Sequence, residues 1–73
     1  MIPRYPRNSQ RQLWALLGAF RRGERLTAIM ALRAYEILAL SQRCGDLRRL
    51  GWPIESRLIR TRSDKHVSEY WIA

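Results

Sequence analysis

The sequence predicts a mainly α-helical domain that ends in a small β-hairpin, which is an α+β fold. Apolar residues recur at helical spacing through most of the chain as far as Gly51. Gly51 and Pro53 then prevent the last helix from continuing. Residues 54–72 are rich in β-formers and lack helical periodicity. With 73 residues, the chain is one small domain, and its function is expected at the surface or in a shallow groove.

A flexible basic arm, residues 1–8, is expected before the single domain at residues 9–73. Pro3 and Pro6 lie too close together for a helix and favour extended backbone. Short termini of this kind are often disordered.

The first helix is expected to begin at Ser9. Ser9 and Gln12 have the spacing of a capping box, in which each side chain bonds the backbone of the other residue. Gly23 follows two arginines and suits the position just after a helix C-terminus. One apolar face of this helix consists of Leu13, Leu17 and Phe20.

Two further helices are expected between Thr27 and Leu50. Thr27 is a suitable N-cap for a helix that continues to about Ala34. The apolar pattern changes phase within residues 35–38, which indicates a tight turn before the third helix. Because these residues include no strong helix breaker, one continuous helix is the competing interpretation. The apolar side of the second helix would consist of Ile29, Met30, Leu32 and Ala34.

The C-terminal part of the chain is expected to form a two-stranded hairpin. Its strands would lie within residues 54–62 and 66–72. The connecting turn, Arg62–Lys65, has turn-forming residues but lacks the usual Gly. A very short extra strand is possible near Arg25-Leu26, in the link that precedes the second helix.

Charge is the strongest compositional signal. Fourteen basic residues face six acidic ones, which gives a formal net charge of +8, and Lys65 is the only basic residue that is not Arg. A guanidinium group can bind phosphate or a guanine edge through two hydrogen bonds, which an ammonium group cannot do. This composition favours a nucleic-acid partner over a surface that is merely soluble and cationic.

The third helix has one apolar stripe and one basic face. A helical wheel places Leu40, Cys44 and Leu47 together on the buried side. Asp46 is expected either to pair with a neighbouring arginine, which we favour, or to accept a hydrogen bond from a cytosine amino group. Gly45 either permits a close approach of DNA or relieves crowding against another helix. The predicted DNA contacts of this helix are Gln42, Arg43, Gly45, Arg48 and Arg49.

Three helices followed by a hairpin is the element order of a winged helix-turn-helix domain. The chain also resembles the small winged helix-turn-helix domains that are common in phages and prophages. This resemblance extends from about Ser9 to Ile72, although the family often has Gly where this chain has Glu36 and in the hairpin tip. It rests on Leu26-Thr27, Ala31-Leu32-Arg33, Ile37, Arg43, Asp46-Leu47-Arg48, Gly51-Trp52-Pro53-Ile54 and Tyr70.

The resemblance and the charge together imply sequence-specific binding of double-stranded DNA. The third helix would enter the major groove, and the hairpin, or wing, would lie on the backbone or in the minor groove. A phage or prophage transcriptional regulator or a DNA-recombination accessory factor is expected, and a homodimer on DNA is one of the states considered. Predicted contacts of the wing are Arg57, Arg60, Arg62 and Lys65. The arm would add Arg4 and Arg7.

The main alternative is a phage-encoded protein-interaction module that binds a host or phage protein, with Leu38 and Trp71 as anchors. An enzyme is not expected, because the sequence has one His, one Cys and no clustered metal ligands or paired carboxylates, and no cofactor is expected either. The single cysteine, Cys44, fits a reducing compartment. No apolar run approaches the roughly 20 residues that span a membrane, so we expect a cytoplasmic protein with no membrane partner.

Overall fold

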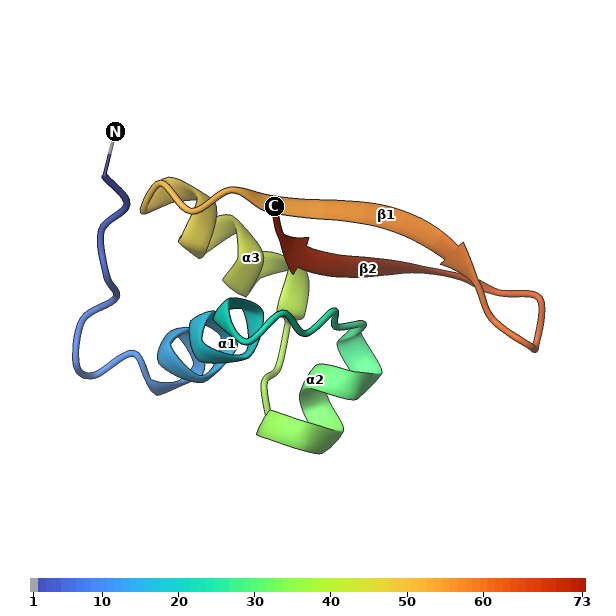
Figure 1. Ribbon diagram of the computed structural model, residues 1–73. Coiled ribbons are helices and arrows are strands. Elements are labelled where there is room, and N and C mark those ends of the chain that lie inside the picture. Colours follow the sequence, from blue (N-terminus) through green and yellow to red (C-terminus); the bar gives the residue numbers. More distant parts are fainter. Residues whose placement is uncertain (1) are drawn as a thin grey trace.

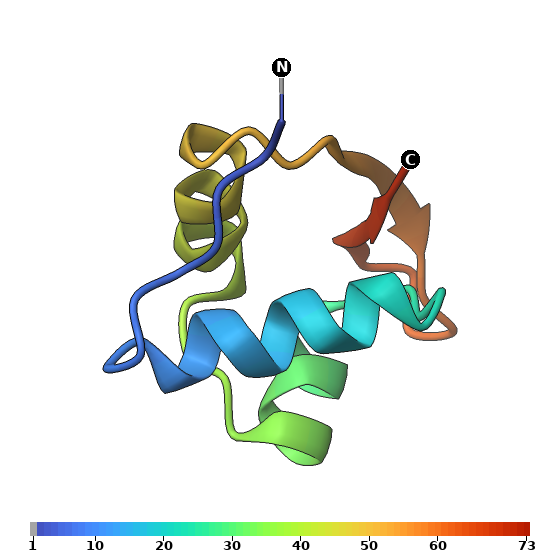
Figure 2. The same ribbon diagram turned by 60° about the vertical axis from the view of Figure 1, so that its left-hand side comes forward.

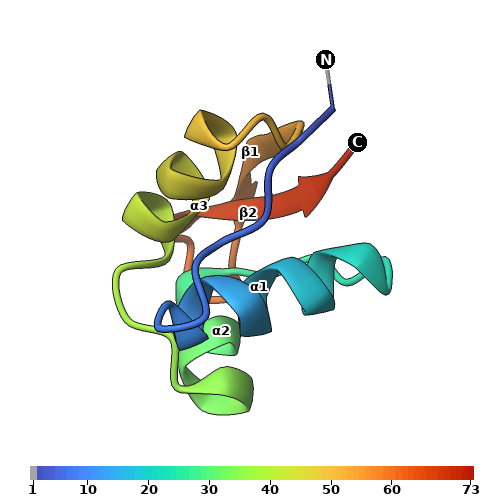
Figure 3. The same cartoon turned by 90° about the vertical axis from the view of Figure 1, so that its left-hand side faces the viewer.

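The computed structural model describes residues 2–73 and has the predicted element order (Figure 1). Three helices come first and a two-stranded antiparallel hairpin follows, so the fold class is confirmed. In Figures 2 and 3, α1 lies between α3 above it and α2 below it. The elements are α1 (Arg11–Arg21), α2 (Ala28–Tyr35), α3 (Leu40–Arg49), β1 (Ile54–Arg60) and β2 (His66–Ile72).

The start of α1 differs from the prediction. Its N-cap is Gln10, and no side chain caps the helix, so the expected Ser9 capping box is wrong. The Gln10 side chain instead accepts a hydrogen bond from the Arg7 backbone N–H at 2.9 Å, which turns the chain into the helix. At the other end, Gly23 has a φ of +87°, the left-handed conformation that was expected after this helix.

A turn with two left-handed residues separates α2 from α3. Thr27 caps α2 as predicted, because its hydroxyl accepts from the Met30 N–H at 3.4 Å. Glu36 then has a φ of 55° and Ala39 a φ of 53°. These conformations interrupt any helix, so the interpretation as one continuous helix is wrong and α3 begins only at Leu40.

The hydrophobic core lies between α1, α3 and the base of the hairpin. Within α2, Ala31 is buried and Tyr35 packs against the core. The predicted apolar side of α2 is wrong, because Ile29, Met30, Leu32 and Ala34 are all exposed. The buried residues of the core are Leu13, Leu16, Leu17, Ala19, Phe20, Leu26, Ala31, Ile37, Leu40, Cys44, Leu47 and Ile54.

The hairpin extends well beyond the helices (Figure 1). Its register runs from the Ile54–Ile72 pair at the base to the Arg60–His66 pair near the tip. Leu26 pairs with Tyr70 through two backbone hydrogen bonds of 2.9 and 2.8 Å, on the other edge of β2. The expected short strand is therefore present as a single bridge. It joins the link before α2 to the base of the hairpin.

The N-terminal segment, which was expected to be a flexible arm, is packed against the domain (Figure 2). The Arg4 N–H donates to the Leu50 carbonyl at 2.8 Å, and the Trp52 indole donates to the Arg4 carbonyl at 2.7 Å. Tyr5 stacks on Trp14 with ring centroids 5.7 Å apart and meets Trp52 edge-on at 5.5 Å. These contacts hold the segment beside the C-terminal end of α3.

Candidate nucleic-acid interface

The solvent face of α3 is the centre of the candidate interface. Leu40, Cys44 and Leu47 are buried as the helical wheel predicts, and Gln42 is exposed on the opposite side. A Cβ atom built on Gly45 would have no neighbour within 4 Å. Crowding against another helix therefore does not explain Gly45. Because Gly45 has no side chain, another molecule can come close to the backbone of α3 at this position.

Asp46 joins two of the predicted DNA-contact arginines. One carboxylate oxygen lies 3.2 Å from the Arg43 guanidinium, and the other accepts from the Arg49 guanidinium. Both arginines are three residues away along the helix, which places all three side chains on neighbouring turns. Of the two roles expected for Asp46, the structure shows the ion pair with arginine. Arg43 and Arg49 are consequently held on either side of one carboxylate.

Arg48 lies on the side of α3 that faces the hairpin. Its Nε–H donates to the Ile54 carbonyl at 3.0 Å, which fastens the end of α3 to the start of β1. The side chain is still exposed, so its predicted DNA contact stays a prediction.

The hairpin tip carries two cations that have no acidic partner within residues 2–73. These are Arg62 and Lys65. Nearer the base, Arg57 pairs with Glu69 at 3.2 Å and Arg60 pairs with Asp64 at 3.3 Å.

A tight turn places the two free cations at the end of the wing. Thr61 closes it, because its N–H donates to the Lys65 carbonyl at 2.8 Å. Asp64, with a φ of 62°, takes the left-handed position that Gly often fills in such turns. The turn at the wing tip therefore forms with Asp64 in the position that Gly often occupies.

The predicted arm residues are brought to different places. Arg4 lies beside the C-terminal end of α3 through its backbone bond to Leu50. Arg7 lies at the start of α1, where its carbonyl accepts from the Trp14 indole at 3.0 Å. Gly51, with a φ of +102°, allows this packing, because a Cβ there would lie only 3.3 Å from the Cα of Pro3. Arg4 is therefore placed at the C-terminal end of α3, and Arg7 at the N-terminal end of α1.

Ser41 was not predicted as a site residue, although its position suits one. It is exposed in the first turn of α3, next to Gln42. Recognition helices contact base edges with residues near their N-termini. The sequence pattern gave a turn within residues 35–38 but no exact start for the third helix, and Ser41 therefore did not stand out as a first-turn residue.

Trp71 lies on the outer face of the hairpin, as strand alternation predicts, but it is covered. The Arg25 guanidinium lies 4.4 Å from the centroid of its ring, and Arg57 lies over the same ring at 5.9 Å. Both arginines also pair with Glu69. Trp71 is thus half-buried in a cation–π cluster and is not the free anchor that the protein-interaction alternative assumed.

Cys44 is chemically quiet. Burial raises the pKa of its thiol to about 12, which leaves it protonated at neutral pH. Within residues 2–73, no group of three or more His, Cys, Asp or Glu side chains is arranged to hold a metal ion. In the same part of the chain, none of the helices is long and apolar enough to cross a membrane.

Comparison with protein families gives one match, to a model described as a winged helix-turn-helix domain, over residues 11–73. Neither the curated proteins nor the solved structures give a match. The matched segment contains all three helices and both strands. The chain therefore belongs to the winged helix-turn-helix domain family, whose fold is one that binds DNA.

Proposed function

We propose that this protein binds double-stranded DNA with sequence specificity, with α3 in the major groove and the wing on the backbone or in the minor groove. The observation that carries the proposal is the solvent face of α3. There, Gln42 is exposed, and the same helix carries two guanidinium groups that are held on the Asp46 carboxylate. A carboxamide can bond the N6 and N7 atoms of adenine, and a guanidinium can bond O6 and N7 of guanine.

The interface divides into reading and anchoring parts. Gln42, Ser41 and the arginines of α3 would read base edges, since they lie on the helix that fits the groove. Arg62 and Lys65 would bind phosphates, because they are exposed at the end of a projecting hairpin. Phosphate contacts carry no direct sequence information, so the wing would add affinity for all duplexes alike.

The test compares Gln42→Ala with Arg62→Ala by fluorescence anisotropy. The probes are a duplex selected from a randomised pool and a scrambled duplex of equal length, each titrated over a series of salt concentrations. Gln42→Ala should lower discrimination between the two duplexes by about 1–3 kcal/mol. Arg62→Ala should weaken both complexes equally and reduce the salt slope by about 0.9. Equal losses from both substitutions on every duplex would contradict this division.

The biological role that we propose is narrower and rests on the sequence resemblance. The protein would be a phage or prophage transcriptional regulator or recombination accessory factor. It would act on DNA in the host cytoplasm or nucleoid, without a cofactor and without enzymatic activity. A palindromic selected site would indicate that the protein binds as a homodimer, because the symmetry of an operator mirrors that of the protein. A single asymmetric half-site would indicate a monomer.

A further inference from the structure

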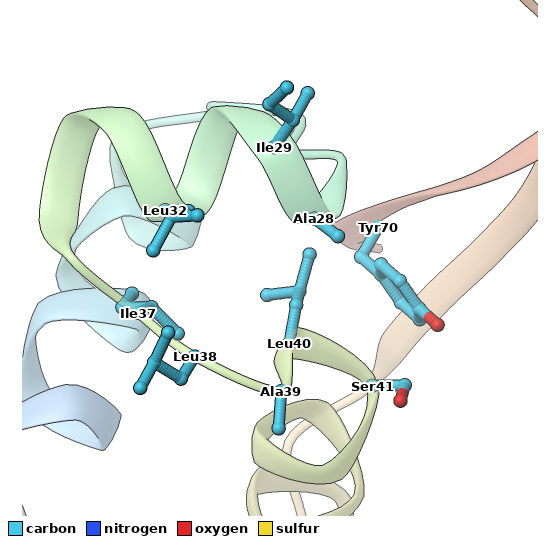
Figure 4. Close-up of a pocket in the computed structure, with 9 residues that line it drawn as sticks. All are labelled: Ala28, Ile29, Leu32, Ile37, Leu38, Ala39, Leu40, Ser41 and Tyr70. Carbon is cyan, nitrogen blue, oxygen red and sulfur yellow. The ribbon is translucent and has the colours of Figure 1, made fainter.

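An apolar groove of about 560 Å³ lies between α2, the turn after it, the first turn of α3 and the base of β2 (Figure 4). Leu32 and Leu40 line it from opposite sides, and Tyr70 closes the end next to the hairpin. Ser41 and Tyr70 contribute the only polar side chains of its lining. The groove is therefore suited to an apolar ligand surface and not to a phosphate backbone.

Large apolar side chains at this groove are left in solvent. Ile29 is 56% exposed, Leu32 is 46% exposed and Leu38 is 62% exposed. Ile29 and Leu32 are three residues apart on α2 and Leu38 lies in the turn, so these side chains border one continuous surface. Such a patch at the rim of a groove marks an interaction site in soluble proteins. Nothing within residues 2–73 covers it.

The fold explains why α2 can present this face. It is attached to the rest of the domain through the buried Ala31 and through Tyr35, whose hydroxyl bonds both Glu24 and Arg22. Its remaining apolar side chains are not needed for these contacts. The side chains of Ile29 and Leu32 on α2 are therefore left uncovered for a partner.

Charge indicates the chemistry of the partner. The chain has a net charge of +8, and most of its acidic side chains are already paired with arginines. Arg33 follows Ile29 by four residues and is exposed on the same helical face, and Glu36, which has no ion pair within residues 2–73, ends α2 beside the groove. The attraction for an acidic segment therefore comes from the net charge of the chain. A second copy of this chain would bring two strongly positive surfaces together, whereas an acidic segment would be attracted. The paired acids are Glu24, Asp46, Asp64 and Glu69.

We propose that the groove is the docking site for an amphipathic helix of another protein, with an apolar face and acidic flanks. Apolar residues at positions i, i+3 or i+4, and i+7 of that helix would contact Ile29, Leu32 and Leu38. The docked helix would lie beside Ser41 and Gln42. If these residues contact DNA, as proposed above, the acidic helix repels the phosphate backbone there and the two partners compete.

The test uses a display library of 15-residue peptides on the immobilised full-length protein. Positions i, i+3, i+4 and i+7 are restricted to apolar residues, and the others vary among Glu, Lys, Gln and Ala. Glu should be enriched over Lys in the selected peptides. The affinity of a selected peptide, measured by anisotropy, should fall at least tenfold in Leu38→Ser and in Ile29→Ser. Leu58→Ser is the matched control, because Leu58 is 69% exposed on the wing and does not line the groove.

Each other outcome contradicts the proposal in a distinct way. Selection of Lys-rich peptides, or of none, would exclude an acidic helix. A dimer in sedimentation equilibrium that Leu38→Ser dissociates would show that a second copy covers the groove. Loss of DNA binding in Leu38→Ser with unchanged peptide binding would assign the groove to the DNA interface. Since all three substituted side chains are exposed, circular dichroism melts should match the wild type, and peptide binding is measured without DNA.

Discussion

Asp46 is expected to control how the recognition helix presents its arginines. The substitution Asp46→Asn keeps the size of the side chain but removes the charge that pairs with Arg43 and Arg49. Both guanidinium groups would then be free to contact phosphates. We expect tighter binding to unrelated DNA and a smaller preference for the selected duplex, because the freed groups no longer hold one geometry.

The size of this effect follows from the contacts. Ion pairs three residues apart on a helix contribute about 0.2–0.5 kcal/mol each, and an acid in the C-terminal half of a helix is disfavoured by its dipole. Loss of the two pairs should therefore cost less than about 1 kcal/mol of folding free energy. For DNA, each guanidinium that gains a phosphate steepens the slope of log K against log salt by about 0.9, which gives up to about 1.8 for both.

The measurement is fluorescence anisotropy with the selected and scrambled duplexes over a salt series, together with urea denaturation. Glu55→Gln is the matched control, because it makes the same charge change at an exposed carboxylate that has no ion pair within residues 2–73. This control should raise affinity slightly and leave the salt slope unchanged. If Asp46→Asn and Glu55→Gln gave the same slope and the same specificity ratio, Asp46 would act only through net charge and the reasoning would fail.

Three further predictions concern folding. Cys44 should resist iodoacetamide at pH 8 until urea unfolds the chain, because its thiol is buried. The pKa of this thiol is about 12 in the folded chain and about 9 in the unfolded chain. Its contribution to the free energy of unfolding is therefore complete below about pH 9 and is lost as the pH rises toward about 12. Tyr5→Ala should lower the free energy of unfolding by about 1–2 kcal/mol, because the Tyr5 ring packs on Trp14 and Trp52. The fluorescence emission of these two tryptophans should shift to the red, and an unchanged spectrum would contradict the packing of the arm. Glu36→Gly should raise stability in urea by about 0.5–1 kcal/mol, because Gly adopts the left-handed conformation without strain.

The parts of the fold that local chemistry determines were predictable. The Thr27 cap, the glycine after α1 and the Gly51–Pro53 stop each act through a few neighbouring atoms. The buried stripe of α3 follows from the helical period alone.

Features that depend on distant contacts were not predictable. Glu36 and Ala39 adopt left-handed conformations that their residue types disfavour, so only the change of apolar phase indicated the turn and its geometry could not be predicted. The apolar periodicity of α2 predicts an amphipathic helix. It does not tell whether the rest of the domain covers the apolar face, and the structure leaves most of that face exposed. The arm is held by backbone bonds to Leu50 and by the ring of Tyr5, which composition cannot distinguish from a free terminus.

The pairing of arginines changes what the net charge means for DNA binding. Among the predicted wing contacts, only Arg62 and Lys65 lack an acidic partner within residues 2–73, and these two alone predict a salt slope of about −1.8. Arg57 and Arg60 are held by exposed ion pairs, which are weak enough for a phosphate to replace the carboxylate. A measured slope much steeper than −1.8 would therefore mean that these pairs open on DNA, or that the predicted contacts without an ion pair, Arg4, Arg7 and Arg48, also bind phosphates. A slope near −1.8 would mean that the wing touches DNA with its tip alone and that α3 contributes base contacts rather than phosphate contacts.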